Sequence, residues 1–417
     1  MQRTIAQKLE ILADAAKFDA SCASSGGTKR NSKNGGIGST TGAGICHAYT
    51  PDGRCVSLLK ILLTNFCRYD CAYCVSRRSS NVERARFSVA EVVTLTLDLY
   101  SRNCIEGLFL SSGIARSEDD TMLDLVLVAK TLRLEHQFNG YIHLKTIPGA
   151  DERLISEAGL YADRLSMNVE LPNETSLQTY APEKNVGTIK KGLALTRGRI
   201  ESDRDNAKSA PGKINRGRSR RFAPAGQSTQ VIVGADVSSD VTILRGSVSL
   251  YASYALKRVY YSAFSPTGQP SANLPDSPVP LWREHRLYQA DWLLRFYGFA
   301  IDDLEKAAPT GMLPMDIDPK LAWALQHRGE YPLDINRAPR EMLLRVPGLG
   351  VKAVDRIIVA RRSGKLRLAD VARISGAITR ARPFIMTEDW RPTALLDDAR
   401  LLDKARVKPV RQLDLFS

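Results

Sequence analysis

The sequence predicts an α/β protein in which an open, partial (β/α)6 barrel is followed by a small all-α domain. Three observations support this prediction. Six short apolar runs are each followed by a helical pattern, three cysteines follow the first run, and a Gly-rich turn separates two helical patterns near the C-terminus. The predicted strands are residues 56–63, 107–112, 141–147, 164–171, 230–234 and 258–264.

Helical patterns lie between these strands. One begins at Ser88, where S-V-A-E makes a capping box with Glu91, and the next opens with the acidic residues S-E-D-D. Because strands and helices alternate, we expect a parallel sheet with helices outside, and such barrels bind ligands at the C-terminal ends of their strands. Further helices are predicted at about 149–160, 186–199, 238–256 and 281–299.

Composition shifts divide the chain into five expected segments. A helix and a loop rich in Gly and Ser come first, then the barrel, a linker that contains proline, a helical domain and a tail. Their expected limits are residues 1–55, 56–305, 306–329, 330–390 and 391–417.

The charge of the chain favours a polyanionic partner. The 417 residues carry 59 Lys and Arg against 45 Asp and Glu, a formal charge of +14. From Glu330 to the end there are 18 Lys and Arg against 11 Asp and Glu, so half of the excess lies in about a fifth of the chain. A basic surface also keeps a protein soluble, so the positive charge favours a polyanionic partner without identifying one.

The sequence contains neither a membrane span nor a secretion signal. No apolar run reaches the roughly 20 residues that a span needs, and the charged N-terminal helical pattern lacks the apolar core of a signal peptide. Seven cysteines without such a signal indicate a reducing compartment rather than a disulfide framework. We therefore expect a cytoplasmic protein with metal or redox chemistry and no membrane partner.

Three of these cysteines, Cys67, Cys71 and Cys74, form a C-x3-C-x2-C cluster directly after the first predicted strand. Thiolates bind soft metals and iron–sulfur clusters. A structural zinc site needs four ligands, and His47 or Cys55 would complete one only at a non-standard spacing. A ferredoxin-type cluster with a fourth cysteine, Cys55 or Cys104, is a second alternative.

A third reading leaves one iron without a protein ligand. The spacing C-x3-C-x-aromatic-C, with Tyr73 before the last cysteine, resembles the signature of radical S-adenosylmethionine (SAM) enzymes over about residues 56–265. The resemblance implies a [4Fe–4S] cluster on Cys67, Cys71 and Cys74, with SAM bound at the open iron. It also implies reductive cleavage of SAM to a 5′-deoxyadenosyl radical, which abstracts hydrogen from a substrate.

The same resemblance implies further SAM-binding positions. A turn after the second strand, here Ser-Ser-Gly, holds the methionine amino group, and a cation ending the third strand meets the carboxylate. Polar residues at the fourth strand end bind the ribose, and a glycine after the fifth lies beside the adenine. The implied cofactor-binding residues are Tyr73, Ser111, Ser112, Gly113, Lys145, Asn168, Glu170 and Gly234.

The C-terminal helical domain contains the turn V-P-G-L-G between two helical patterns. Pro347, Gly348 and Gly350 predict a tight hairpin whose backbone N–H groups suit a phosphate oxygen, with Lys352 in the next helical turn. This pattern resembles the helix-hairpin-helix motif of DNA-binding and repair proteins. A weaker second copy lies within 366–385. We expect contacts to the backbone of duplex DNA.

The chain ends in a short motif of its own. The residues Q-L-D-L-F resemble the peptide by which bacterial replication and repair proteins bind the sliding clamp. The resemblance implies an extended tail whose apolar side chains enter a groove of the clamp, while the glutamine supplies a polar contact. The expected clamp-binding residues are Gln412, Leu413, Asp414, Leu415 and Phe416.

Taken whole, the chain resembles the DNA modification/repair radical SAM proteins, a bacterial family. The resemblance rests on the cysteine motif, the stretches A-P-A-G-Q-S-T-Q (223–230) and R-E-H-R-L-Y-Q-A-D-W-L-L-R-F-Y-G-F (283–299), and the hairpin domain. It implies an enzyme that repairs or modifies DNA and draws electrons from a low-potential donor such as flavodoxin or ferredoxin. An enzyme acting on structured RNA and a non-catalytic iron–sulfur DNA-binding protein are the alternatives.

Overall fold

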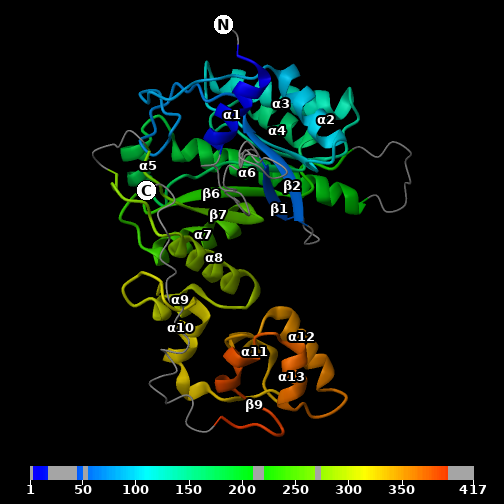
Figure 1. Ribbon diagram of the computed structural model, residues 1–417, viewed down its shortest axis with the longest axis vertical. Coiled ribbons are helices and arrows are strands. Elements are labelled where there is room, and N and C mark those ends of the chain that lie inside the picture. Colours follow the sequence, from blue (N-terminus) through cyan, green and yellow to red (C-terminus); the bar gives the residue numbers. More distant parts are fainter. Residues whose placement is uncertain (1–2, 17–44, 50–54, 210–219, 268–273, 393–417) are drawn as a thin grey trace, which may run out of the picture. The chain divides into compact units, whose positions relative to one another are not determined.

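The computed structural model describes residues 3–16, 45–49, 55–209, 220–267 and 274–392 (Figure 1). They form two compact units. The first contains the chain up to Val237 together with Ser249–Val279, and the second contains Ser238–Val248 and the chain from Pro280 onward. Among the described helices, none is long and apolar enough to cross a bilayer.

The first unit is built on one seven-stranded sheet whose strands follow one another in chain order. Strands β2 to β7 are parallel, and β1 pairs with β2 in the antiparallel direction at one edge. The six predicted strands are confirmed, whereas β1 lies in the segment expected to be a loop. The strands are β1 Ile45–Tyr49, β2 Cys55–Leu62, β3 Gly107–Ser111, β4 Tyr141–Lys145, β5 Arg164–Ser166, β6 Gln227–Val233 and β7 Arg258–Ala263.

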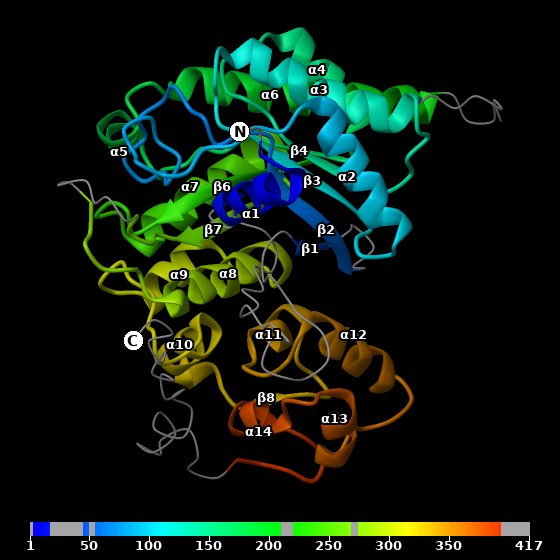
Figure 2. The same ribbon diagram turned by 45° about the horizontal axis from the view of Figure 1, so that its top comes forward.

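Helices connect the parallel strands, and α2, α3, α4 and α6 pack in succession along the sheet (Figure 2). The capping box of α2 is confirmed: Ser88 Oγ accepts from the Glu91 amide at 3.2 Å, and Glu91 Oε2 accepts from the Ser88 amide at 2.8 Å. Helix α5 had not been predicted. The helices of this region are α1 Ile5–Ala16, α2 Val89–Ser101, α3 Glu118–Leu134, α4 Glu152–Tyr161, α5 Glu174–Tyr180 and α6 Val186–Ser209. Helix α7, Asp240–Tyr254, begins in the second unit and ends in the first.

The two faces of the sheet differ in character. Leu108 and Leu110 of β3 and Leu144 of β4 are fully buried on the face that carries the helices. Side chains of opposite parity, such as Ser111 and Lys145 at the ends of the same strands, line a pocket instead. Alternation along each strand therefore separates an apolar packing face from a polar binding face.

Strand β5 is shorter than predicted. The apolar pattern predicted 164–171, but the strand ends at Ser166, and Glu170 adopts a left-handed backbone with φ of 66°. Pairing with β6 resumes only as a single bridge between Glu170 and Val231. A left-handed glutamate interrupts a strand and is uncommon, and such residues gather at functional sites.

The second unit is mostly helical, and its limits differ from the expected ones. Helices α8 and α9 belong to it rather than to the barrel segment 56–305. The expected linker 306–329 contains α10, whose Trp323 is buried, because this stretch packs against α8 and α9. The elements are α8 Leu281–Phe296, α9 Ile301–Ala307, α10 Pro319–Gln326, α11 Arg340–Arg345, α12 Val351–Ala360, α13 Leu368–Ile374 and α14 Ile378–Ala381, with β8 Leu333–Asp334 paired to β9 Ile385–Met386.

We predict that Gly107→Ala destabilises the barrel. A methyl group at Gly107 would lie 2.1 Å from the Tyr141 carbonyl oxygen of the neighbouring strand, so the sheet would have to shift. The unfolding free energy, measured by urea denaturation, should fall by about 1–3 kcal/mol. The matched control is Gly198→Ala in α6, where nothing lies within 4 Å and the change should be neutral or stabilising. Equal stability of the two variants would contradict this prediction.

Candidate active site

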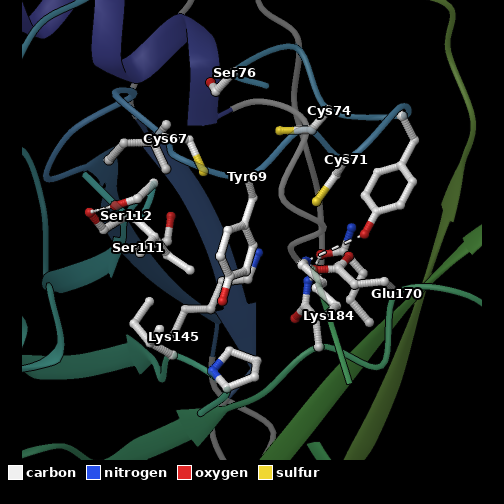
Figure 3. Close-up of a pocket in the computed structure, with 18 of the residues that line it drawn as sticks. Cys67, Tyr69, Cys71, Cys74, Ser76, Ser111, Ser112, Lys145, Glu170 and Lys184 are labelled. Atoms are coloured by element: carbon white, nitrogen blue, oxygen red, sulfur yellow. Dashed lines mark hydrogen bonds and ion pairs between the residues drawn. The ribbon is translucent and has the colours of Figure 1, made fainter. Parts of the chain in front are cut away.

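A pocket opens at the C-terminal ends of the parallel strands, as expected for a barrel of this kind (Figure 3). Together with its open mouth it spans about 1070 Å³ of empty space. Ten of the eleven residues predicted for the cluster and SAM line it, whereas Gly234, which follows β6, does not. The ten are Cys67, Cys71, Tyr73, Cys74, Ser111, Ser112, Gly113, Lys145, Asn168 and Glu170.

The three cysteine side chains converge on this pocket from one irregular loop (Figure 3). Burial raises the pKa of Cys71 to about 12 and that of Cys74 to about 11. The thiols of Cys71 and Cys74 are therefore neutral when free, and binding of iron, which needs thiolates, releases their protons. Among the described residues, no three His, Cys, Asp or Glu side chains are grouped closely enough for a single metal ion. Three soft sulfur donors, each on its own iron, fit a cluster.

A network of polar side chains holds the cysteine loop, which contains neither helix nor strand. The guanidinium of Arg84 donates to the carbonyls of Ser76 at 2.8 Å, Arg77 at 2.6 Å and Ser80 at 3.0 Å. The Asn65 side chain accepts from the Ala85 amide at 2.8 Å. These bonds replace the backbone ladder that a regular element would have.

The turn after β3 approaches the cysteine loop closely at Gly113. Its amide donates to the Thr64 carbonyl at 2.7 Å, and a Cβ atom there would lie 2.5 Å from the Phe66 carbonyl oxygen. Glycine is therefore required by the backbone beside it. Ser112 donates through its hydroxyl to the Gly113 carbonyl at 2.7 Å. This tight packing sets the Ser-Ser-Gly turn beside the thiols.

A charged network forms the opposite wall of the pocket (Figure 3). Lys184 Nζ lies 2.6 Å from Glu170 Oε1 and 3.3 Å from the Tyr73 hydroxyl. Asn168 Nδ2 lies 3.3 Å from Gln230 Oε1 and 3.5 Å from Glu170 Oε2. The predicted ribose pair is thus brought together with the predicted tyrosine by a lysine that sequence reasoning missed.

Lys184 remains an ammonium inside the pocket. Burial by itself lowers its pKa, but the carboxylate of Glu170 outweighs burial and holds the pKa well above its usual value. The lysine follows α5, the helix that had not been predicted. In the sequence, the role of Lys184 was indicated only by its position, a basic residue that follows the polar residues at the end of the fourth predicted strand.

Tyr69 is a second pocket residue that sequence reasoning missed. Its ring lies between Cys67 and Lys145 in Figure 3, and its hydroxyl donates to Glu118 Oε1 at 2.5 Å. Burial raises the pKa of Tyr69, and the hydrogen bond to Glu118 adds to the rise, so the phenol stays protonated. The acidic start of α3 thereby anchors a side chain within the cysteine motif.

Comparison with known proteins identifies the class of this site. Residues 61–202 match the model of the Radical SAM superfamily, and no curated protein matches the sequence. Residues 61–202 are therefore a Radical SAM domain, and this domain supports a radical SAM enzyme. Enzymes of the superfamily use a [4Fe–4S] cluster and S-adenosylmethionine, and the three thiols of the pocket supply the matching donor set.

Several solved structures are similar to this chain at a low level. Methylornithine synthase (PylB) is 14% identical, with a TM-score of 0.41 over 57% of this chain and 61% of its own. The hydrogenase maturase HydG from Carboxydothermus hydrogenoformans is 15% identical, with a TM-score of 0.39 over 56% of this chain and 50% of its own. This chain therefore spans about half to three fifths of their lengths, and the likeness carries no argument about its reaction.

Different side chains of the pocket are suited to the [4Fe–4S] cluster and to SAM. When bound, the cluster supplies one electron to the sulfonium of SAM, which yields the radical that abstracts hydrogen. Cys67, Cys71 and Cys74 are the residues that would hold the cluster. Lys145 and Lys184 present positive charge suited to a carboxylate. The Ser-Ser-Gly turn, Asn168 and Glu170 supply polar groups that suit the amine and hydroxyl groups of SAM.

We predict that replacing any one of Cys67, Cys71 and Cys74 with Ala abolishes the cluster, because three thiolates are already the minimum that this site offers. After anaerobic reconstitution, bound iron and sulfide should fall to background and SAM cleavage should be lost. The matched control is Cys104→Ala, an exposed cysteine outside the pocket. Full iron content in a Cys71→Ala protein would refute this assignment.

We predict that Lys184→Met weakens SAM binding. Loss of the ammonium leaves the Glu170 carboxylate buried without its cation, and removes one of the two cations of the pocket. The dissociation constant for SAM, measured calorimetrically on the reconstituted protein, should rise by about 10- to 100-fold. Lys190→Met, at an exposed position of α6, is the control and should bind normally. An unchanged constant for Lys184→Met would exclude this role.

Proposed function

We propose that this radical SAM enzyme acts on DNA, where it repairs or modifies a base or sugar. The observation that carries the proposal is the backbone of the turn Val346–Gly350 between α11 and α12. The proposal follows from three properties of the second unit: the geometry of this turn, the support beneath it and the charge around it.

The turn presents backbone donors at the start of a helix. Gly348 has φ of 84°, which only glycine adopts without strain. Gly350 is the N-cap of α12 and provides no side-chain cap. The Val351 amide donates to the Tyr297 hydroxyl, so the amides of the next two residues, Lys352 and Ala353, are those proposed to meet an external acceptor. Lys352 lies exposed in the first turn of α12. A phosphate oxygen suits this combination of amides and ammonium.

The second predicted hairpin, S-G-A, supports the first. Ser375 Oγ donates to the Gly348 carbonyl at 3.1 Å and accepts from the Ala377 amide at 3.3 Å. A Cβ atom on Gly348 would lie 2.7 Å from the Ala377 carbonyl oxygen. The two turns therefore pack as a pair, in which the second one supports the first.

Further partners follow from the same proposal. Contacts of this kind go to the nucleic-acid backbone and leave sequence unread. Structured RNA offers the same phosphates, and is the alternative substrate. A low-potential flavodoxin or ferredoxin is the proposed electron donor. The clamp-binding peptide, Gln412 to Phe416, lies outside the described residues, and the sliding clamp stays a prediction.

We predict that the full-length protein binds duplex DNA more tightly than transfer RNA, and that Lys352→Gln weakens DNA binding by about 1–3 kcal/mol and lowers its salt slope by about 1. Fluorescence anisotropy over a salt series measures both. Lys190→Gln, remote in sequence on α6, is the matched control.

Duplex DNA carrying damaged bases should also raise the release of 5′-deoxyadenosine by the reduced enzyme. Tighter binding of transfer RNA, with release stimulated by RNA alone, would replace DNA with RNA as the substrate. Binding that Lys352→Gln leaves unchanged would remove the hairpin from the proposal.

A further inference from the structure

We propose that Lys320 positions the Val346–Gly350 turn and makes phosphate binding at that turn proton-linked, an inference that rests on the proposed DNA-binding function. Lys320 belongs to α10, within the stretch expected to be a linker. Its side chain points into the second unit, where an unpaired ammonium would be costly. The structure supplies partners for it at the underside of the turn.

Lys320 and Tyr297 hold the turn from inside. Lys320 Nζ donates to the Leu349 carbonyl at 2.6 Å and lies 4.6 Å from the centre of the Tyr297 ring. The Tyr297 hydroxyl accepts from the backbone amide of Val351, the first residue of α12. One ammonium and one phenol thus fix the carbonyl before Gly350 and the amide after it.

The charged groups around Lys320 come from each element packed against it. Asp318 precedes it on the same segment and forms an ion pair with Arg380 of α14. Arg286 of α8 faces the same pair, and Lys352 of α12 lies on the outer side of the turn. Lys320 itself donates to a neutral carbonyl, since the nearby carboxylate is already paired with arginine.

This environment allows the ammonium to lose its proton near neutral pH. Burial lowers the pKa of Lys320 to about 7; Asp318 opposes the fall and Arg380 adds to it. A phosphate bound at the turn adds negative charge close to the ammonium and favours its protonated form. Binding therefore raises this pKa, and above about pH 7 the protein takes up a proton as it binds. Below that pH Lys320 is already charged and the linkage disappears.

Proton uptake is measured directly on the full-length protein. The probe is a mixed-sequence DNA duplex, titrated calorimetrically at pH 8 in buffers of different ionisation enthalpy. We expect uptake of up to one proton for each turn that is occupied. Affinity should fall by up to about tenfold per pH unit above pH 7 from this group alone.

Two substitutions at Lys320 separate charge from packing. Lys320→Met removes the ammonium, so DNA affinity should fall and proton uptake should vanish. Lys320→Arg keeps a permanent charge, so affinity at pH 8 should match or exceed that of the wild type while uptake again vanishes. His327→Gln, which removes a side chain at the end of the same helix, is the matched control and should leave uptake unchanged.

The outcomes are distinct. DNA binding with proton uptake that both Lys320 substitutions abolish supports the inference. Binding without uptake, or uptake that survives Lys320→Met, overturns it and leaves DNA binding intact. If the Met variant fails to fold, Lys320→Arg decides: loss of uptake in that variant supports the inference, and uptake that survives it overturns the inference. Absence of duplex binding at pH 6 and pH 8 overturns the proposed function, and the inference with it.

Discussion

The placement of three thiols on a loop without regular structure is the constraint on which the active site depends. A cluster needs its ligands at fixed separations, yet this loop has no ladder of its own to fix them. The protein meets the requirement from outside, with Arg84 gathering carbonyls of the loop and Asn65 pairing with its return segment. Gly113 brings the next strand end into backbone contact with the same loop. Residues that flank the cysteine motif, together with the end of β3, therefore hold the loop that carries the thiols.

The opposite wall of the pocket, formed by Lys184, Glu170 and Tyr73, is held together by the balance of buried charges. Lys184 lies in contact with Glu170 and Tyr73, so a buried carboxylate and a buried ammonium stabilise each other beside the thiols. Glu170 reaches this position only through a left-handed backbone that ends β5 early. The strained backbone of Glu170 thus places a polar wall at the end of an otherwise apolar strand.

Much of the fold could be predicted from the sequence, because hydrophobic periodicity and helix capping depend on residues close together in the chain. Six strands, the capping box at Ser88 and the glycine turn at Gly348 all follow from neighbouring residues. Other features depend on contacts between residues far apart in the chain. Lys184 reaches Tyr73 across 111 positions, and Trp323 in the expected linker is buried by other helices. The shortening of β5 escaped notice because apolar residues continue past its end.

The division of the chain into two units has a practical consequence. The backbone passes from one unit to the other at residues 237, 248 and 279, so each unit is assembled from separate stretches of sequence. A single cut after residue 279 keeps both stretches of the first unit but removes Ser238–Val248 from the second. A fragment ending at residue 305 would cut α9, which runs to Ala307, and would separate α8 from α10, its packing partner, so that apolar surface becomes exposed. Isolating the second unit whole therefore requires residues 238–248 to be grafted onto it.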